Sequence, residues 1–219
     1  MAFTLPGRFR AVVFDLDGLL IDTEPGWQRA EAELLRRHGQ TYTEADAAAS
    51  LGSPIWEVVD SYARRLGLDR AGRERLLAEL MHLARAEYAG ELALRPGAHE
   101  LLEQLHGQIP LGVASNTPRE LVDAALVASD LARYFQAVVT AEDVARPKPA
   151  PDIYLESCRR LGVEAGEAVA LEDSALGIAA SRAAGLMVVG VPQFGGVDTS
   201  AAHHVVASLR ELMPVEPAQ

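Results

Sequence analysis

The feature that most constrains this chain is a run of four apolar residues that leads directly into two carboxylates. Residues Ala11 to Phe14 are apolar, Asp15 and Asp17 follow with one residue between them, and Gly18 comes next. A short apolar run bounded by a turn signal is typical of a buried strand in a parallel sheet. Residues i and i+2 of an extended segment share a face, so both carboxylates could point into one site. Such close carboxylates repel unless a cation or a shared proton intervenes. A plain Asp-Gly turn is the alternative interpretation.

Strand-like and helix-like segments alternate after residue 92. We predict strands at about 110–114, 137–140, 168–171 and 187–191, with a short edge strand at 205–206 and helices between the strands. Strands that alternate with helices of this length indicate right-handed βαβ units and a parallel sheet. The expected fold class is therefore α/β, with a Rossmann-like parallel sheet core.

A helical block interrupts this α/β pattern after the first strand. Helices are predicted at about 26–37, 43–49, 54–67 and 71–89, and residues 41–92 contain no convincing strand. An all-helical insertion of this kind suggests a separate small domain. We expect a discontinuous core made of residues 1–22 and 93–219, and an inserted helical bundle made of residues 23–92.

Composition excludes several classes of protein. The 219 residues carry 20 basic and 31 acidic side chains, a net charge of −11, which argues against a broad nucleic-acid surface. No apolar run approaches the roughly 18–20 residues that cross a bilayer, and the first residues lack the hydrophobic core of a signal peptide. The single cysteine, Cys158, allows no internal disulfide. We expect a cytoplasmic protein with no nucleic-acid or membrane partner, although a small anionic substrate is compatible with its charge.

Three predicted strands end in side chains that can bind a metal or a phosphate. Together with a lysine from a connecting segment, these residues are Asp15 and Asp17, Ser115 and Asn116, Glu172 and Asp173, and Lys148. A parallel sheet brings the carboxyl ends of its strands to one edge, where ligands bind, so we expect the side chains to converge. Carboxylates suit Mg²⁺, whereas a hydroxyl, backbone N–H groups and a lysine suit phosphoryl oxygens. The set is what phosphoryl transfer to an aspartate would need.

Each of these groups has an ordinary structural alternative. Ser115 and Asn116 could cap the helix that follows them, and Glu172 with Asp173 could form a capping cluster at a helix N-terminus. Lys148 stands between Pro147 and Pro149 and could be an exposed loop lysine. Their joint occurrence, with polar groups at successive strand ends and Lys148 between them, is much less expected by chance than any one of them alone.

Taken in order, these motifs resemble those of the haloacid dehalogenase-like hydrolases over nearly the whole chain. The matching segments are Asp15-Leu16-Asp17-Gly18, Ser115-Asn116, Lys148-Pro149 with Pro151-Asp152-Ile153-Tyr154, and Glu172-Asp173-Ser174 with Gly177. The helical insertion is similar to the helical cap of this family. The segment Asp22 to Pro25, followed by Trp27, resembles the sugar-phosphate phosphatase branch, which includes enzymes acting on 2-deoxyglucose 6-phosphate and hexitol phosphates.

The resemblance implies catalytic roles for four residues. Asp15 would attack phosphorus and become an aspartyl phosphate. Asp17 would protonate the leaving alkoxide and then activate the water that cleaves the intermediate. Ser115 and Lys148 would hold the phosphoryl group.

It also implies a metal site and a substrate site. Mg²⁺ would be held by Asp15, the backbone carbonyl of Asp17 and Asp173, with Glu172 near or in its coordination shell. The expected substrate-binding residues are Glu24, Trp27, Gly52, Ser115, Asn116 and Lys148. Trp27 could instead belong to the core of the cap.

The resulting functional hypothesis is a Mg²⁺-dependent phosphatase of a small phosphorylated sugar or polyol, acting through an aspartyl phosphate. A β-phosphoglucomutase-type mutase is the alternative, but those enzymes carry a histidine where Trp27 stands and a cap-loop arginine that Ser53-Pro54 does not supply. A non-catalytic module on this fold would be expected to lose Asp15 or Asp17, and a dehalogenase would not need Asp17 or the metal cluster. A monomer is expected from the habit of the family.

Overall fold

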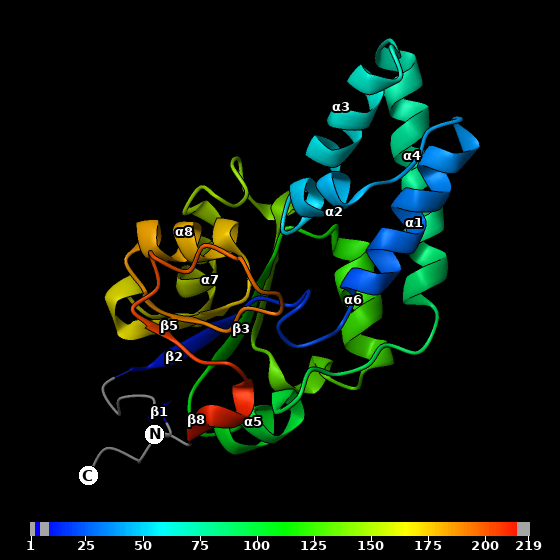
Figure 1. Cartoon of the computed structure of the whole chain (residues 1–219). Coiled ribbons are helices and arrows are strands. Elements are labelled where there is room, and N and C mark those ends of the chain that lie inside the picture. Colours follow the sequence, from blue (N-terminus) through cyan, green and yellow to red (C-terminus); the bar gives the residue numbers. More distant parts are fainter. Residues whose placement is uncertain (1–2, 5–8, 214–219) are drawn as a thin grey trace.

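The structure, a computed structural model, describes residues 3–4 and 9–213. Its centre is a parallel sheet with the strand order β4-β3-β2-β5-β6-β7 (Figure 1). The strands are β2 (Ala11–Phe14), β3 (Leu111–Ser115), β4 (Ala137–Thr140), β5 (Ala168–Glu172), β6 (Met187–Gly190) and β7 (His204–Val205). This architecture confirms the predicted α/β, Rossmann-like fold class.

Helices cover both faces of the sheet, which explains the unbroken apolar run in β2. Val12 and Phe14 pack with residues of α5 (Ala98–Leu105) and α6 (Arg119–Ala128). Ala11 and Val13 pack on the opposite face with residues of α7 (Asp152–Leu161) and α8 (Ala175–Ala184). A strand buried on both faces needs apolar residues at every position.

The strand order explains where a ligand can bind. The chain leaves β2 for β3 and β4 on one side and later returns through α7 to β5 on the other side. Ligands of open α/β sheets bind beyond the carboxyl ends of the strands, where the order reverses in this way. The crevice therefore begins at the end of β2.

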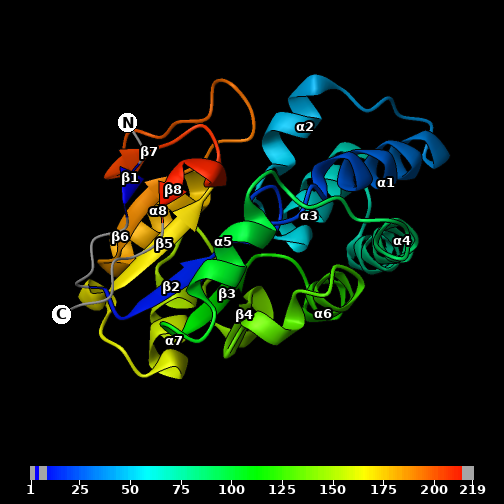
Figure 2. The same cartoon turned by 90° about the horizontal axis from the view of Figure 1, so that it is seen from below.

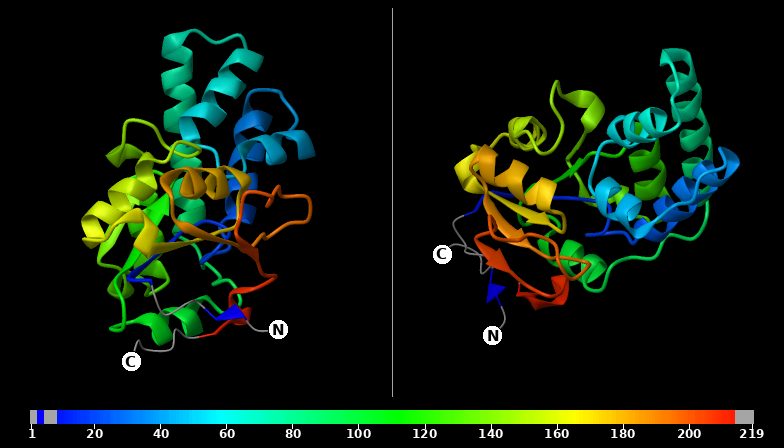
Figure 3. Two further views of the ribbon diagram at one scale, coloured as in Figure 1. Left: turned by 90° about the vertical axis from the view of Figure 1, so that its left-hand side faces the viewer. Right: turned by 45° about the horizontal axis from the view of Figure 1, so that its top comes forward.

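Between β2 and α5 the chain forms a helical block, which Figures 2 and 3 show beside the sheet. It consists of α1 (Glu24–Arg37), α2 (Glu44–Ser50), α3 (Ile55–Arg65) and α4 (Arg70–Tyr88). An apolar cluster of its own, which includes Leu34, Val59 and Leu80, holds the block together. The end of α4, at Tyr88, packs into the main core. The division into two domains stays a prediction.

Capping interactions fix the starts of two of these helices. Thr43 and Asp46 form a reciprocal capping box at α2, and the Asp69 side chain accepts a hydrogen bond from the backbone N–H of Gly72 at α4.

No helix among the described residues is long and apolar enough to span a bilayer.

Two short segments lie next to the main elements. Thr23 stands at the N-cap of α1 but makes no capping hydrogen bond; its hydroxyl donates to Asp17 Oδ1 instead, at 2.7 Å. A short strand β1 (Phe3–Thr4) pairs in parallel with β8 (Leu212–Met213). The connecting 3₁₀ turns are η1 (Ala132–Tyr134), η2 (Ala141–Asp143), η3 (Ala165–Glu167) and η4 (Leu209–Glu211).

Candidate active site

Asp15 lies directly beyond β2, and Lys148 lies against it. The backbone N–H of Asp15 donates to the carbonyl of Leu171 in β5, which fixes the start of the loop. Lys148 Nζ is 2.5 Å from Asp15 Oδ1 and 2.5 Å from Glu172 Oε1. Lys148 is only 1% exposed, so it is not an exposed loop lysine.

Burial dominates the electrostatics of this pair. Removal from water raises the pKa of Asp15 to about 8, with added repulsion from Glu172 and Asp17, although Lys148 opposes the rise. Burial by itself would lower the pKa of Lys148, but Asp15 and Glu172 outweigh it and raise that pKa. Without further positive charge, Asp15 would therefore tend to hold a proton, which would make it a poor nucleophile.

Glu172 is occupied by hydrogen bonds on both oxygens. Oε1 accepts from Lys148 and from the hydroxyl of Tyr154 at 2.5 Å, and Oε2 accepts from the backbone N–H and the hydroxyl of Ser174. A Cβ atom at Gly177 would lie 1.7 Å from Glu172 Oε1, so the first turn of α8 needs glycine there. Glu172 thus orients Lys148.

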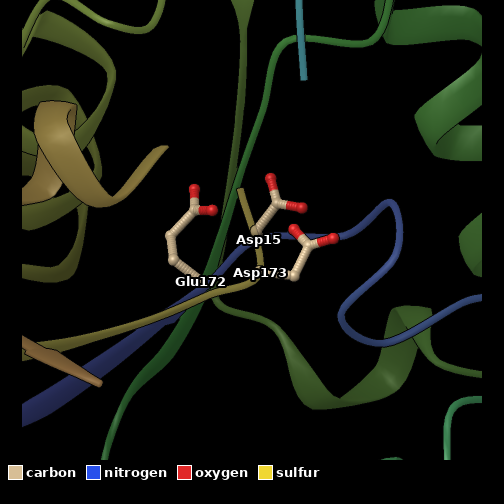
Figure 4. A group of neighbouring side chains, drawn as sticks. All are labelled: Asp15, Glu172 and Asp173. Carbon is tan, nitrogen blue, oxygen red and sulfur yellow. The ribbon is translucent and has the colours of Figure 1, made fainter. Parts of the chain in front are cut away.

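Asp15, Glu172 and Asp173 form a cluster that could hold a metal ion (Figure 4). One oxygen from each lies within 4.8 Å of the others, and all three residues are buried. Asp173 Oδ1 is buried with no hydrogen-bond partner among the described residues, and burial together with Asp15 and Glu172 raises the pKa of Asp173 well above its usual value. A buried carboxylate without a partner is costly, and hard carboxylate oxygens are the ligands that Mg²⁺ prefers. The donor set therefore fits this ion.

Gly18 lets the loop after Asp17 approach this cluster. Its φ angle is +81°, and a Cβ atom there would lie 2.2 Å from Asp173 Oδ2. Any other residue would collide with the carboxylate and strain the backbone. The glycine of the first motif is thus required by the close approach to Asp173.

Asp17 is held by four hydroxyl groups. Oδ1 accepts from Thr23 at 2.7 Å and Tyr88 at 2.5 Å, and Oδ2 accepts from Ser115 at 3.0 Å and Thr117 at 2.8 Å. The Asp17 side chain therefore takes no part in the carboxylate cluster.

Tyr88 is a residue that the sequence did not single out. It lies at the end of α4, is 2% exposed, and accepts a hydrogen bond from Trp27 Nε1 at 3.0 Å while it donates to Asp17. The rings of Trp27 and Tyr88 pack edge to face. The helical block is thereby joined to Asp17. Thr117 and Tyr154 were also missed as contacts of the predicted site residues.

Asn116 ties three segments together. Its Nδ2 donates to the carbonyl of Gly52, at 2.9 Å, and to that of Lys148, while its Oδ1 accepts from the backbone N–H of Lys148. Gly52 belongs to the loop between α2 and α3, so this amide joins the helical block to the strand end and holds the Lys148 loop in place.

One cavity collects almost all the predicted site residues. It measures about 680 Å³, part of which is open to solvent, and lies between the strand ends and the helical block. Its lining includes Asp15, Asp17, Glu24, Trp27, Gly52, Ser115, Asn116, Lys148 and Asp173. Glu172 lies behind Lys148. Trp27 both lines the cavity and packs in the helical block, so its two interpretations are compatible.

Comparison with known proteins decides the family. A sequence model described as "Haloacid dehalogenase-like hydrolase" matches residues 12–191. The chain belongs to the haloacid dehalogenase-like hydrolases. The match covers β2 from its second residue, all of β3 to β6, and all the predicted site residues.

Several phosphatases are similar to this chain over most of its length. The fructose-1-phosphate phosphatase YqaB of Escherichia coli is 32% identical over 84% of this chain and 97% of its own length. Hexitol phosphatase B of Escherichia coli is 33% identical over 85% of each chain. A structure of a CbbY variant from Rhodobacter sphaeroides in complex with xylulose-(1,5)bisphosphate superimposes with a TM-score of 0.83, at 28% identity, over 92% of this chain and 95% of that one. The predicted family and enzyme class, a phosphatase of this family, are confirmed.

Proposed function

We propose that this chain is a Mg²⁺-dependent phosphatase of a small phosphorylated sugar or polyol that works through an aspartyl phosphate on Asp15. The observation that carries the proposal is the contact of buried Lys148 with both Asp15 and Glu172 at the end of a cavity, beside Asp173, whose Oδ1 has no hydrogen-bond partner in the described part of the chain. This is the arrangement of a carboxylate poised to receive a phosphoryl group.

In the first step a carboxylate oxygen of Asp15 attacks phosphorus, and the bond between phosphorus and the ester oxygen breaks. Asp17 gives its proton to the departing alkoxide. Lys148 donates to the phosphoryl oxygens, and so does the Ser115 hydroxyl once it turns away from Asp17. Asp15, Asp173 and the backbone carbonyl of Asp17 would hold Mg²⁺, with Glu172 adjacent, and the ion would supply positive charge to Asp15 and the phosphoryl group.

In the second step water attacks the phosphorus of the aspartyl phosphate. Asp17, now ionised, takes a proton from this water, and the bond from phosphorus to Asp15 breaks to release inorganic phosphate. The hydroxyl groups of Thr23, Tyr88 and Thr117 aim the Asp17 carboxylate in both steps.

The substrate class is supported by the relatives, which are named for fructose 1-phosphate and hexitol phosphates. The helical block supplies a wall of the cavity with Glu24 and Trp27, as a cap that selects the substrate would. We propose residues 23–92 as that cap and residues 1–22 with 93–219 as the core.

A panel assay of phosphate release tests this proposal. With Mg²⁺ present, the enzyme should hydrolyse fructose 1-phosphate and hexitol phosphates with higher kcat/KM than p-nitrophenyl phosphate. The same reactions without Mg²⁺ and with Asp15→Asn are the controls. Equal rates with and without Mg²⁺, or phosphate release by Asp15→Asn at the wild-type rate, would contradict it.

A further inference from the structure

The two ends of the cavity differ in charge. At the strand end, Lys148 offsets Asp15. On the helical side the charged lining residues are Glu24 and Glu31, both on α1. Among the described residues that line the cavity, Lys148 is the only cation, and it is already paired with two carboxylates. The part of the cavity away from the strand ends is therefore acidic.

Glu31 is the unusual member of this wall. It is 3% exposed, and its Oε2 accepts a hydrogen bond from the Tyr62 hydroxyl at 2.6 Å. No lysine or arginine contacts it among the described residues. Burial raises the pKa of Glu31 to about 7, although hydrogen bonding from Tyr62 and Ser50 opposes the rise. Burial of a carboxylate without a contacting cation costs free energy. Its position in the lining of a cavity therefore suggests that it contacts a ligand.

The surfaces around Glu31 are suited to a polyhydroxylated chain. Trp27, Ile55, Val58 and Leu80 give the helical wall an apolar surface that can pack against C–H groups, and Ser50 adds a hydroxyl. Ligand sites commonly combine an apolar lining with a few placed polar groups. A hydroxyl that donates to a carboxylate makes a charge-assisted hydrogen bond.

We propose that Glu31 is a specificity-determining residue, which accepts hydrogen bonds from hydroxyl groups at the non-phosphorylated end of the substrate and disfavours a second phosphate at that end. This inference rests on the proposed function. A second phosphate would lie beside Glu24 and Glu31, neither of which is offset by a cation among the described lining residues, and like charges in a partly desolvated cavity repel. The favoured substrate is therefore a monophosphate whose other end is neutral and carries hydroxyls. The CbbY variant in the similar structure, in contrast, holds a bisphosphate.

The experiment compares initial rates on fructose 1-phosphate and on fructose 1,6-bisphosphate, in which either phosphate placed at Asp15 leaves the other at the far end. Assays at about pH 8 keep Glu31 ionised. For the wild-type enzyme we expect kcat/KM for the monophosphate to exceed that for the bisphosphate by at least about 100-fold. Glu31→Gln keeps the size of the side chain and one acceptor, and we expect it to lower this ratio by about tenfold. The kcat/KM for the monophosphate should fall in this variant because KM rises, whereas kcat should stay nearly unchanged.

Two further variants make the result specific. Glu31→Asp keeps the charge, so it should retain the discrimination against the bisphosphate even where its KM for the monophosphate rises. Glu33→Gln makes the same change at a half-buried position of α1 that is outside the cavity lining and pairs with Arg36 and Arg37, and it should keep the wild-type ratio. A cooperative thermal unfolding transition, measured for each variant, identifies the variants that are natively folded.

Comparable wild-type kcat/KM values for the two esters would overturn the inference, as would an unchanged ratio in natively folded Glu31→Gln. The wild-type comparison decides the question if Glu31→Gln fails to fold. Failure of the proposed function itself would look different, because no phosphate ester, p-nitrophenyl phosphate included, would then be hydrolysed.

Discussion

The cavity has two halves, one at the strand ends and one on the side of the helical block, and their buried carboxylates are stabilised in different ways. At the strand ends, Asp15 and Glu172 share the cation of Lys148, and Asp173 completes a set that fits a metal. On the helical side, Glu31 accepts a hydrogen bond from the hydroxyl of Tyr62, and no lysine or arginine of residues 3–4 and 9–213 contacts it. The strand-end half thus places a lysine and a set of carboxylates that would hold a cation where a phosphate would react, whereas the helical half carries two carboxylates that no lysine or arginine among the described lining residues offsets. The reaction and the choice of substrate are assigned to different elements of the fold.

The largest effect should come from removing the proposed nucleophile at the strand end. Asp15→Asn keeps the shape of the side chain but replaces the attacking carboxylate with an amide, so kcat should fall by about 10⁴-fold or more. Phosphate release from fructose 1-phosphate measures it. Asp123→Asn, an exposed position on α6, is the matched control and should retain wild-type activity. A fall of less than tenfold would mean that the strand-end half does not carry the reaction.

Removal of Mg²⁺ tests whether a metal ion offsets the carboxylates at the strand ends. Chelation should lower kcat by at least about 10³-fold, because the phosphoryl group and Asp15 would lose their main positive charge. Mg²⁺ at 100 times its Kd should also stabilise the folded enzyme by about 2.7 kcal/mol, seen as a higher Tm. Asp173→Asn should lose this stabilisation, whereas Asp198→Asn, on an exposed loop, should keep it. A Tm that does not respond to Mg²⁺ in the wild-type enzyme would argue against the metal site.

Tyr88→Phe tests the link between the two halves. The variant removes one of the four hydroxyl donors to Asp17 and the acceptor of Trp27 Nε1, while the ring stays in place. We expect kcat to fall by about tenfold with KM changed less than about twofold, since the hydrogen bond positions the proposed acid–base residue rather than the substrate. The pH–rate profile should shift as well. Tyr134→Phe, whose hydroxyl contacts Glu103 and Arg133, is the control. A change confined to KM would place Tyr88 in substrate binding instead.

The smallest effect is a pH-dependent stability that arises on the helical side. Glu31 has a pKa of about 7 in the folded protein and an ordinary value of 4.5. Between these values the folded state binds more protons than the unfolded state, so this contribution to stability is complete below about pH 4.5 and is lost as pH rises through 7. The free energy of unfolding of the wild-type enzyme, relative to Glu31→Gln, should therefore fall by about 1–3 kcal/mol between pH 5 and pH 8. Urea unfolding at the two pH values measures it, and a constant difference would contradict the assignment.

The predictable part of the molecule was the part fixed by local pattern. The apolar run of β2, the strand–helix alternation and the polar groups that follow the strands are local signals, and parallel topology then brings Asp15, Lys148 and Asp173 to one edge. Their burial could not be read from the sequence, as the loop alternative for Lys148 illustrates. The contacts of Tyr88 with Asp17 join residues that are 71 positions apart, and that of Tyr62 with Glu31 spans 31. Such pairs depend on how α1, α3 and α4 pack and rotate, which no local pattern specifies.

The central claim, that Asp15 carries the phosphoryl group, is tested most directly by trapping the intermediate. In Asp17→Asn, p-nitrophenyl phosphate should still phosphorylate Asp15, because nitrophenolate leaves without a proton, but activation of the water should fail. Acid-quenched protein, digested and sequenced by mass spectrometry, should then carry a phosphoryl group on Asp15 in amounts close to the enzyme concentration. A burst of nitrophenolate with no phosphoryl group on Asp15, or with one on another residue, would contradict the account.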